Sequence, residues 1–140
     1  MKLLLDTHAL LWWLDGDAKL ILAARSLIAD ESNEIFVSAA SAWEISTKVR
    51  IGKLPGAVEV AAKLPQIIVS QGFDALPITI DHAQRAGALP GPHRDPFDRM
   101  LAAQAQAENM PIISRDAIFD TYAVARLWDT PVPIGAPDPG

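Results

Sequence analysis

The stretch KLLLDTHALLWWL, residues 2–14, joins a short apolar run to a carboxylate and then to a second apolar segment. The run from Lys2 to Leu5 is typical of a strand buried in a parallel sheet. Thr7 is a residue type that caps helices, and the apolar residues after it recur at helical spacing. The stretch therefore predicts a buried strand that ends at Asp6 and leads at once into a helix.

The remainder of the chain repeats this alternation of strand and helix. Apolar runs predict further strands at residues 35–37, 73–78, 111–114 and 124–128. Helical spacing of apolar residues predicts helices at residues 20–28, 43–49, 58–68, 81–86 and 96–108. Strands that alternate with helices imply a parallel sheet covered on both faces. We therefore expect a three-layer α/β domain with a mostly parallel sheet of four to five strands.

Composition limits the class of protein. A chain of 140 residues, 50% of them hydrophobic, is long enough for one compact domain and too short for two. We expect a single domain over residues 1–140, with a tail rich in Pro and Gly from about residue 131. Cysteine is absent, which excludes disulfides and thiolate zinc sites. No apolar run approaches the length of a membrane span, so we expect a cytoplasmic protein without a membrane partner.

The charge balance gives no overall sign of a nucleic-acid binder. The net charge is −5 and the sequence pI is near 5.0, whereas such binders are usually basic. Carboxylates that hold divalent cations nevertheless count as negative in the sequence and are neutralised when the cation binds. An acidic total therefore remains compatible with a nuclease.

Four acidic residues stand beside apolar segments where a carboxylate has no evident role in solubility. Asp6 and Asp116 follow predicted strands, and Glu44 and Asp98 lie early in predicted helices. Because the carboxyl ends of parallel strands share one edge of a sheet, we expect these four side chains to converge on one pocket. Charged groups are seldom buried unless they are paired or bind a cation, so the pattern predicts a metal site.

Carboxylate oxygens are the ligands that Mg²⁺ and Mn²⁺ prefer. One or two such ions can clamp the oxygens of a phosphodiester displacement and activate a water, so that no nucleophilic side chain is needed. Each acid also has a simpler interpretation: Asp6 as a helix cap, Glu44 as the partner of Lys48 on an exposed face, and Asp116 as a turn residue. Only their joint placement favours a metal site.

Other side chains give weaker patterns. Asp95 shares its helix start with Asp98, and one of the two is expected to cap that helix. The histidines lack the spacing of zinc ligands, so each is expected to be a surface or satisfied core residue. Cations near the acids in sequence, among them Lys48, Arg99 and Arg115, could contact RNA phosphates, although solvated charges are the simpler interpretation.

Four segments occur together in one known family. They are LLDTHALLW at residues 4–12, VSAASAWEI at 37–45 followed by Lys48 and GKL at 52–54, HRDPFDRMLAAQA at 93–105 and PIISRD at 111–116. With these segments the chain resembles the PIN-domain ribonucleases, and specifically the VapC-type toxins of bacterial type II toxin–antitoxin systems. The family often has Thr where Ser114 stands, a departure that leaves the hydroxyl in place.

The resemblance implies a PIN-like α/β/α fold and an endoribonuclease that hydrolyses RNA phosphodiester bonds with Mg²⁺ or Mn²⁺ and a metal-activated water. It also implies a homodimer, a cognate antitoxin whose tail enters the active-site groove, and contact with DNA only through that antitoxin. By this likeness the metal-binding acids are Asp6, Glu44, Asp98 and, as the fourth acidic position, Asp116. The residues expected beside the site or at the substrate are Thr7, Asp95, Ser114, Arg99 and Lys48.

Two other classes of protein share parts of the pattern. A phosphoryl-accepting signalling domain also gathers aspartates and Mg²⁺ at strand ends, but it needs a lysine after a late strand, where this chain has Arg115 and Asp116. A non-catalytic interaction module would use the same acids as helix caps. Incubation with a small phosphodonor tests the first alternative, and calorimetry with Mn²⁺ tests the second.

Overall fold

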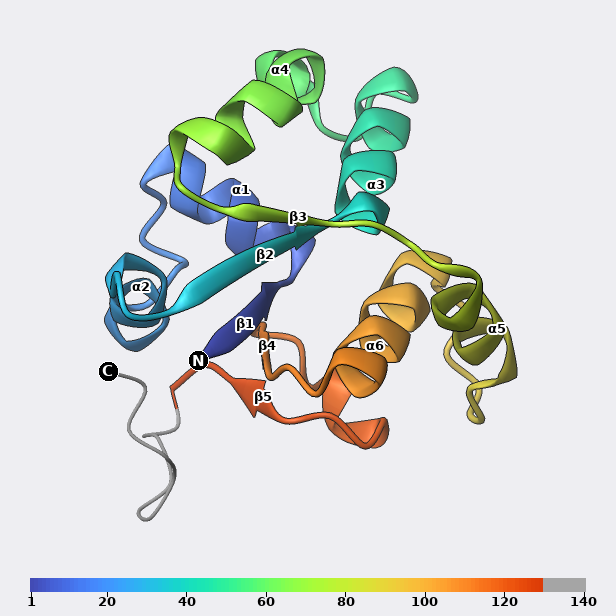
Figure 1. Cartoon of the computed structure of the whole chain (residues 1–140). Coiled ribbons are helices and arrows are strands. Elements are labelled where there is room, and N and C mark those ends of the chain that lie inside the picture. The colour runs from blue at the N-terminus through green and yellow to red at the C-terminus, as the bar shows by residue number, and fades with distance from the viewer. Residues whose placement is uncertain (130–140) are drawn as a thin grey trace.

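Five parallel strands form the central sheet of the protein, whose computed structural model describes residues 1–129. The strands are β1 (Lys2–Leu5), β2 (Glu34–Ser38), β3 (Asp74–Leu76), β4 (Ile112–Ile113) and β5 (Arg126–Leu127). Their order in the sheet is β3-β2-β1-β4-β5, and every neighbouring pair is parallel (Figure 1). The predicted tail from residue 131 lies outside the described residues.

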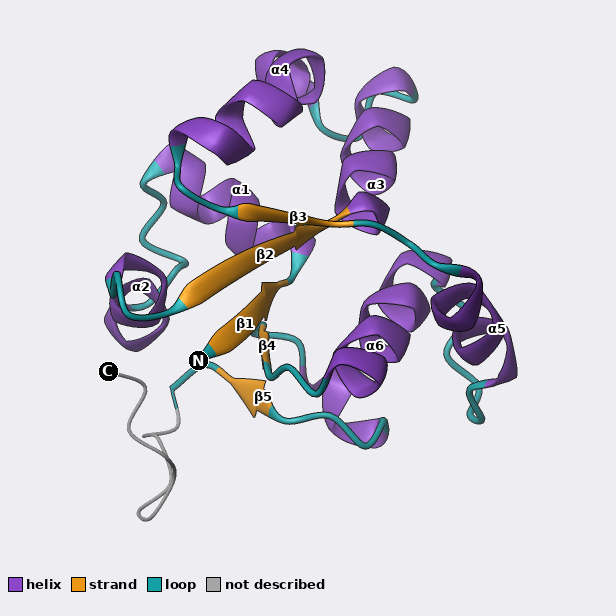
Figure 2. Cartoon of the chain, in the orientation of Figure 1, coloured by secondary structure: helices purple, strands orange, loops and turns teal. Residues whose placement is uncertain are grey.

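Helices cover both faces of this sheet (Figure 2). One face packs against α1 (Thr7–Asp15), α2 (Leu22–Ala29), α3 (Ala39–Arg50) and α4 (Val58–Ser70). The other face packs against α6 (Pro96–Glu108), which pairs with α5 (Ile80–Ala88). The three-layer α/β fold predicted from the sequence is therefore confirmed.

The central strand β1 shows why its sequence is an unbroken apolar run. Successive side chains of a strand point to opposite faces of the sheet. Leu3 and Leu5 pack into the cluster with α1 to α4, whereas Leu4 packs into the cluster with α6. All three are fully buried. A strand covered on both faces needs apolar residues at every position, as the sequence of residues 3–5 has.

Element boundaries differ from the prediction at a few residues. Thr7 is not a cap but the first residue of α1, and its hydroxyl hydrogen-bonds that of Ser41 at 2.8 Å. Ser38 caps α3 by accepting from the backbone N–H of Ala40. β3 ends at Leu76, because the following Pro77 has no N–H to donate to a sheet. Two short 3₁₀ helices, η1 (Pro55–Ala57) and η2 (Ala117–Thr121), were not predicted.

The strand order reverses at the central strand β1, next to β4. From β1 the chain moves to β2 and β3 on one side, and then returns to β4 on the other side of β1. Ligands of open α/β sheets bind beyond the carboxyl ends of the strands where the order reverses in this way. In this protein that point lies between the ends of β1 and β4, where Asp6 and Ser114 follow. Within residues 1–129, no helix has the length and apolar character needed to cross a membrane.

Candidate active site

Asp6 and Ser114 meet at the switch point of the sheet. Asp6 directly follows β1, and its exposed fraction is 6%. Ser114 directly follows β4 and is fully buried. The Ser114 hydroxyl donates to Oδ2 of Asp6 at 2.5 Å and accepts from the backbone N–H of Asp116 at 3.0 Å. Burial raises the pKa of Asp6 above its usual value, although the hydrogen bond from Ser114 acts in the opposite direction.

Glu44 lies in the second turn of α3, and its exposed fraction is 3%. Its carboxylate pairs with the ammonium of Lys48, one turn further along the helix. Burial lowers the pKa of Lys48, but the hydrogen bond and charge of Glu44, together with Asp95 and Asp98, outweigh burial and hold that pKa above its usual value. The pair with Lys48 that the sequence allowed therefore exists, but Glu44 is buried and not on an exposed face.

Asp98 lies in the first turn of α6 and hydrogen-bonds Nε2 of His93 at 3.0 Å. Burial raises the pKa of Asp98 to about 6, against a smaller lowering by the His93 hydrogen bond. The charges of Asp95, Asp6 and Glu44 raise it further. Asp98 is therefore close enough to Asp6, after β1, and to Glu44, in α3, for their charges to affect its pKa.

Asp95 is the N-cap of α6. Its Oδ1 accepts from the backbone N–H groups of Phe97 and Asp98 at 2.9 and 3.2 Å. Among residues 1–129, His93, Asp95 and Asp98 form the one group of three whose possible ligand atoms all lie within 4.8 Å of one another. Within the same residues, Asp6, Glu44 and Asp98 do not form such a group, so side-chain movement is needed before one ion could contact all three.

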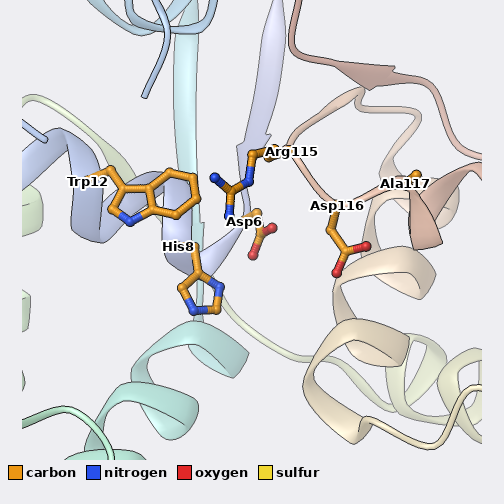
Figure 3. Close-up of a pocket in the computed structure, with 6 residues that line it drawn as sticks. All are labelled: Asp6, His8, Trp12, Arg115, Asp116 and Ala117. Carbon is orange, nitrogen blue, oxygen red and sulfur yellow. The ribbon is translucent and has the colours of Figure 1, made fainter. Parts of the chain in front are cut away.

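Asp116 lies at the rim of a pocket of about 380 Å³ beside Asp6 (Figure 3). Its side chain is exposed and caps η2 by accepting from the backbone N–H of Ile118 at 3.0 Å. Asp116 therefore has the turn role that its sequence position suggested, through one carboxylate oxygen. The other oxygen remains available to the pocket. The pocket is lined by Asp6, His8, Trp12, Arg115, Asp116 and Ala117.

The remaining candidates beside the site have structural partners. The Thr7 hydroxyl is buried against Ser41, which ties α1 to α3. The guanidinium of Arg99 donates to the backbone carbonyls of Ala86, Leu89 and His93, and so fixes the loop that carries His93. Arg99 is therefore committed to backbone groups and has little freedom to reach a substrate.

His93 was not among the site residues predicted from the sequence. It was expected to be a surface or satisfied core histidine, but it is half-buried and bonded to Asp98. Its position five residues before Asp98, in a loop that leads into the helix, was the available signal. The contact depends on how the loop folds back over the start of α6, which spacing alone does not predict.

The donor set suits a hard divalent cation. Burial raises the pKa values of Asp6 and Asp98, the charge of Glu44 raises both further, and Lys48 is the ammonium that pairs with Glu44. Uncompensated carboxylates at partly buried positions cost free energy, which a cation would offset. Carboxylate oxygens are the ligand type that Mg²⁺ and Mn²⁺ prefer, whereas the imidazole of His93 is a ligand type more common at zinc, copper and iron sites.

The fold and the site together define an α/β protein with a carboxylate-lined pocket at the switch point of a parallel sheet. The PIN domain family model matches residues 3–125, and the chain belongs to that family. It is 40% identical over 62 residues to ribonuclease VapC16 of Mycobacterium tuberculosis, a match that spans 44% of this chain and only 43% of that protein. It is 29% identical over 114 residues to ribonuclease VapC22 of the same organism, across 81% of this chain and 85% of that protein.

Solved structures agree with this assignment at the level of the fold. The VapBC2 complex of Rickettsia felis, bound to a promoter DNA fragment, contains a chain that aligns with a TM-score of 0.67 at 19% identity, covering 92% of this chain and all of that one. VapC20 of Mycobacterium tuberculosis, a toxin that cleaves the sarcin–ricin loop, aligns with a TM-score of 0.66 at 16% identity over 90% of this chain and 98% of that one. The chain thus has the PIN fold of VapC toxins.

Proposed function

We propose that the protein is a VapC-type endoribonuclease, the toxin of a type II toxin–antitoxin pair, and that it needs Mg²⁺ or Mn²⁺. The observation that carries this proposal is the convergence of Asp6, Glu44 and Asp98 from three separate elements on one edge of the sheet. Burial raises the pKa of Asp98 to about 6, and the charges of Asp95, Asp6 and Glu44 raise it further. Such a cluster is unfavourable by itself and becomes favourable when a dication binds.

Each residue has a role in this proposal. Asp6, Glu44 and Asp98 would hold the ion, with Asp116 as a fourth acid at the rim of the pocket. The bound ion would supply Lewis acidity that activates a water and offsets the charge on the phosphate. Ser114 orients the Asp6 carboxylate through its 2.5 Å hydrogen bond, and Lys48 restrains Glu44.

The proposal is tested by replacing Asp6 with Asn in the purified protein. Asp6→Asn keeps the size of the side chain and removes the charge, so we expect Mg²⁺- or Mn²⁺-dependent RNA cleavage to fall by about 10²-fold or more. Asp74→Asn is the matched control, because Asp74 is an exposed aspartate at the start of β3. Full cleavage by the Asp6→Asn protein would show that the carboxylate site is not the catalytic centre.

We further propose a homodimer, a cognate antitoxin whose tail enters the acidic groove, and contact with DNA only through that antitoxin. Large apolar side chains such as Leu22, Trp43 and Ile80 are exposed at 78%, 59% and 88%, which is consistent with surfaces that another chain covers. Expression in the bacterial cytoplasm should arrest growth, and Asp6→Asn or co-expression of the antitoxin should relieve the arrest. An unaffected culture that makes the wild-type protein would contradict the toxin role and leave the nuclease role intact.

The two alternative classes receive no support from the comparisons. A phosphoryl-accepting domain would require a lysine after β4, and Arg115 stands at that position. An interaction module would use the acids as caps. Asp95 and Asp116 do cap helices, but Asp6 makes no side-chain cap and Glu44 lies inside α3.

A further inference from the structure

Arg115 is held beside the carboxylates in an unusual way. It follows Ser114 at the end of β4, and its guanidinium lies 4.6 Å from the ring centroid of Trp12 in α1. In Figure 3 the guanidinium lies between the Trp12 indole and the carboxylates of Asp6 and Asp116. Among residues 1–129, no carboxylate oxygen comes within 4.0 Å of its nitrogens, and its N–H groups have no hydrogen-bond partner.

Three other cations near the acids already have partners. Lys48 pairs with Glu44, and Arg99 donates to three backbone carbonyls. Arg126 is paired with Asp120, and it also donates to the backbone carbonyl of Ser114. Arg115 therefore brings an uncommitted guanidinium into a pocket that also contains two carboxylates.

Trp12 gives Arg115 a defined place. The indole of Trp12 is half-buried and packs against the buried Trp128 with ring centroids 6.1 Å apart. A cation over an indole face is attracted by the ring quadrupole, which restricts the long arginine side chain without using its N–H donors. The result is a pre-positioned guanidinium at the wall of the pocket, with no partner for its N–H groups among residues 1–129.

We propose that Arg115, held over Trp12, binds an RNA phosphate next to the phosphodiester that the carboxylate site cleaves. This inference rests on the proposed ribonuclease function. A guanidinium binds phosphate oxygens with two parallel N–H donors, and its charge offsets the repulsion between the acidic site and an RNA backbone. Trp12 acts as a positioning residue that keeps the guanidinium at the mouth of the pocket.

The first test measures binding of a fluorescein-labelled single-stranded RNA of about 12 nucleotides to proteins that carry Asp6→Asn, between about 50 and 200 mM salt. Adding Arg115→Gln should weaken binding about tenfold at low salt and lower the slope of log K against log salt by about 0.7, the value for one lost phosphate contact on a single strand. Arg115→Lys should keep the slope and bind a few-fold more weakly, because it keeps the charge and loses the planar fork. Lys2→Gln, which removes a cation at the opposite end of β1, is the control and should change neither quantity.

The second test separates positioning from folding. In the cleavage-competent protein, Trp12→Leu should raise KM about threefold with kcat unchanged, and Trp12→Phe should restore KM because a phenyl ring also holds a cation. Trp13→Leu is the matched control, since Trp13 is equally half-buried on the same helix but packs near Phe73 and bonds Gln71. Thermal melts establish that each variant is folded.

The outcomes distinguish the two proposals. If wild-type protein cleaves RNA and Asp6→Asn does not, but Arg115→Gln leaves the affinity and the salt slope unchanged, the ribonuclease function stands and the phosphate role of Arg115 is wrong. A slope that falls equally in the Lys2→Gln control would also overturn the specific role, because it would indicate a general effect of charge. If the wild-type protein neither binds nor cleaves RNA, both proposals fail.

Discussion

At the scale of single residues, Ser114 connects Asp6 to the turn that carries Asp116. Its hydroxyl donates to Asp6 and accepts from the N–H of Asp116, so one buried side chain orients an acid and the turn that carries another. Hydrogen bonds to a charged acceptor contribute more to stability than neutral ones, and a buried donor or acceptor left unpaired costs free energy. The hydroxyl, and not the remainder of the side chain, should therefore matter at this position.

We predict that Ser114→Ala lowers the free energy of unfolding by about 1–3 kcal/mol, because Asp6 loses its donor and the Asp116 N–H loses its acceptor. It should also weaken Mn²⁺ binding, since the Asp6 carboxylate loses its fixed orientation. Urea unfolding and calorimetry measure the two effects. Ser114→Thr keeps the hydroxyl and is the control, and an equal loss in both variants would assign the effect to packing.

Asp98 carries a pH dependence with a defined sign. Its pKa in the folded protein is about 6, above the ordinary value of 3.8 for an aspartate, so between these values the metal-free folded protein binds more protons than the unfolded chain. Metal-free stability attributable to Asp98 should therefore fall as pH rises from about 4 to above 6. Asp98→Asn removes the charge, so we predict that it stabilises the metal-free protein by about 1–3 kcal/mol above pH 7 and has little effect below pH 4. Unfolding in EDTA across this range measures the difference, and a variant that is less stable than wild type at pH 8 would contradict it.

At the scale of secondary structure elements, α6 begins with two acids that have different tasks. Asp95 caps the helix by accepting from two backbone N–H groups, whereas Asp98, one turn later, faces His93 and the carboxylates. The preceding loop is fixed by Arg99, which donates to carbonyls of Ala86, Leu89 and His93. The start of α6 is thus held by its cap and by the loop before it, and this fixes the position of Asp98.

We predict that Asp95→Ala destabilises the protein by about 1 kcal/mol, while Asp95→Ser, which can still cap, changes stability by less than about 0.5 kcal/mol. If Asp95 acts only as a cap, Asp95→Ser should also retain Mn²⁺-dependent RNA cleavage. Chemical unfolding and a cleavage assay measure the two properties. A stable Asp95→Ser protein without cleavage would instead make Asp95 part of the metal site, together with His93 and Asp98.

At the scale of the whole molecule, the strand order brings distant segments together. Asp6 comes from the end of β1, Glu44 from α3 and Asp98 from α6, and the two hydrophobic clusters hold these elements on opposite faces of one sheet. A buried chain of polar groups adds a link between layers. In this chain Ser38, which caps α3, bonds Gln104 of α6, and Gln104 in turn reaches His82 of α5. A ligand that contacts Asp6, Glu44 and Asp98 should therefore stabilise the entire fold.

We predict that Mn²⁺ raises the melting temperature of the wild-type protein and that EDTA reverses the change. An ion that binds only the folded state stabilises it by about 2.7 kcal/mol at a concentration about 100 times Kd, which corresponds to a shift of several degrees for a domain of this size. The shift should disappear in the Asp6→Asn protein and remain in the Asp74→Asn control. A wild-type melting curve unaffected by saturating Mn²⁺ would contradict the metal site.

Sequence patterns predicted the elements better than the contacts between them. The apolar run before Asp6 corresponds to β1, because a strand buried on both faces needs an apolar residue at every position. The helical spacing of apolar residues in 96–108 corresponds to α6, because a helix buried on one face repeats its apolar residues with the period of the helix. Thr7 shows the limit: its residue type suggested a cap, but tertiary packing placed its hydroxyl against Ser41. The 3₁₀ helix η2 was missed because its few residues carry no period.

The sequence by itself determined the alternation of strands and helices, the parallel sheet and the family, since these depend on local periodicity and on motifs that lie in order along the chain. It also named the four acids as candidates for one site. Only the tertiary structure decided that Ser114 bonds Asp6 across 108 positions, that His93 faces Asp98, and that Arg115 lies over Trp12 with no carboxylate partner in the described part of the chain. These contacts join side chains from different elements, and their geometry is set by how the elements pack and not by the residue types alone.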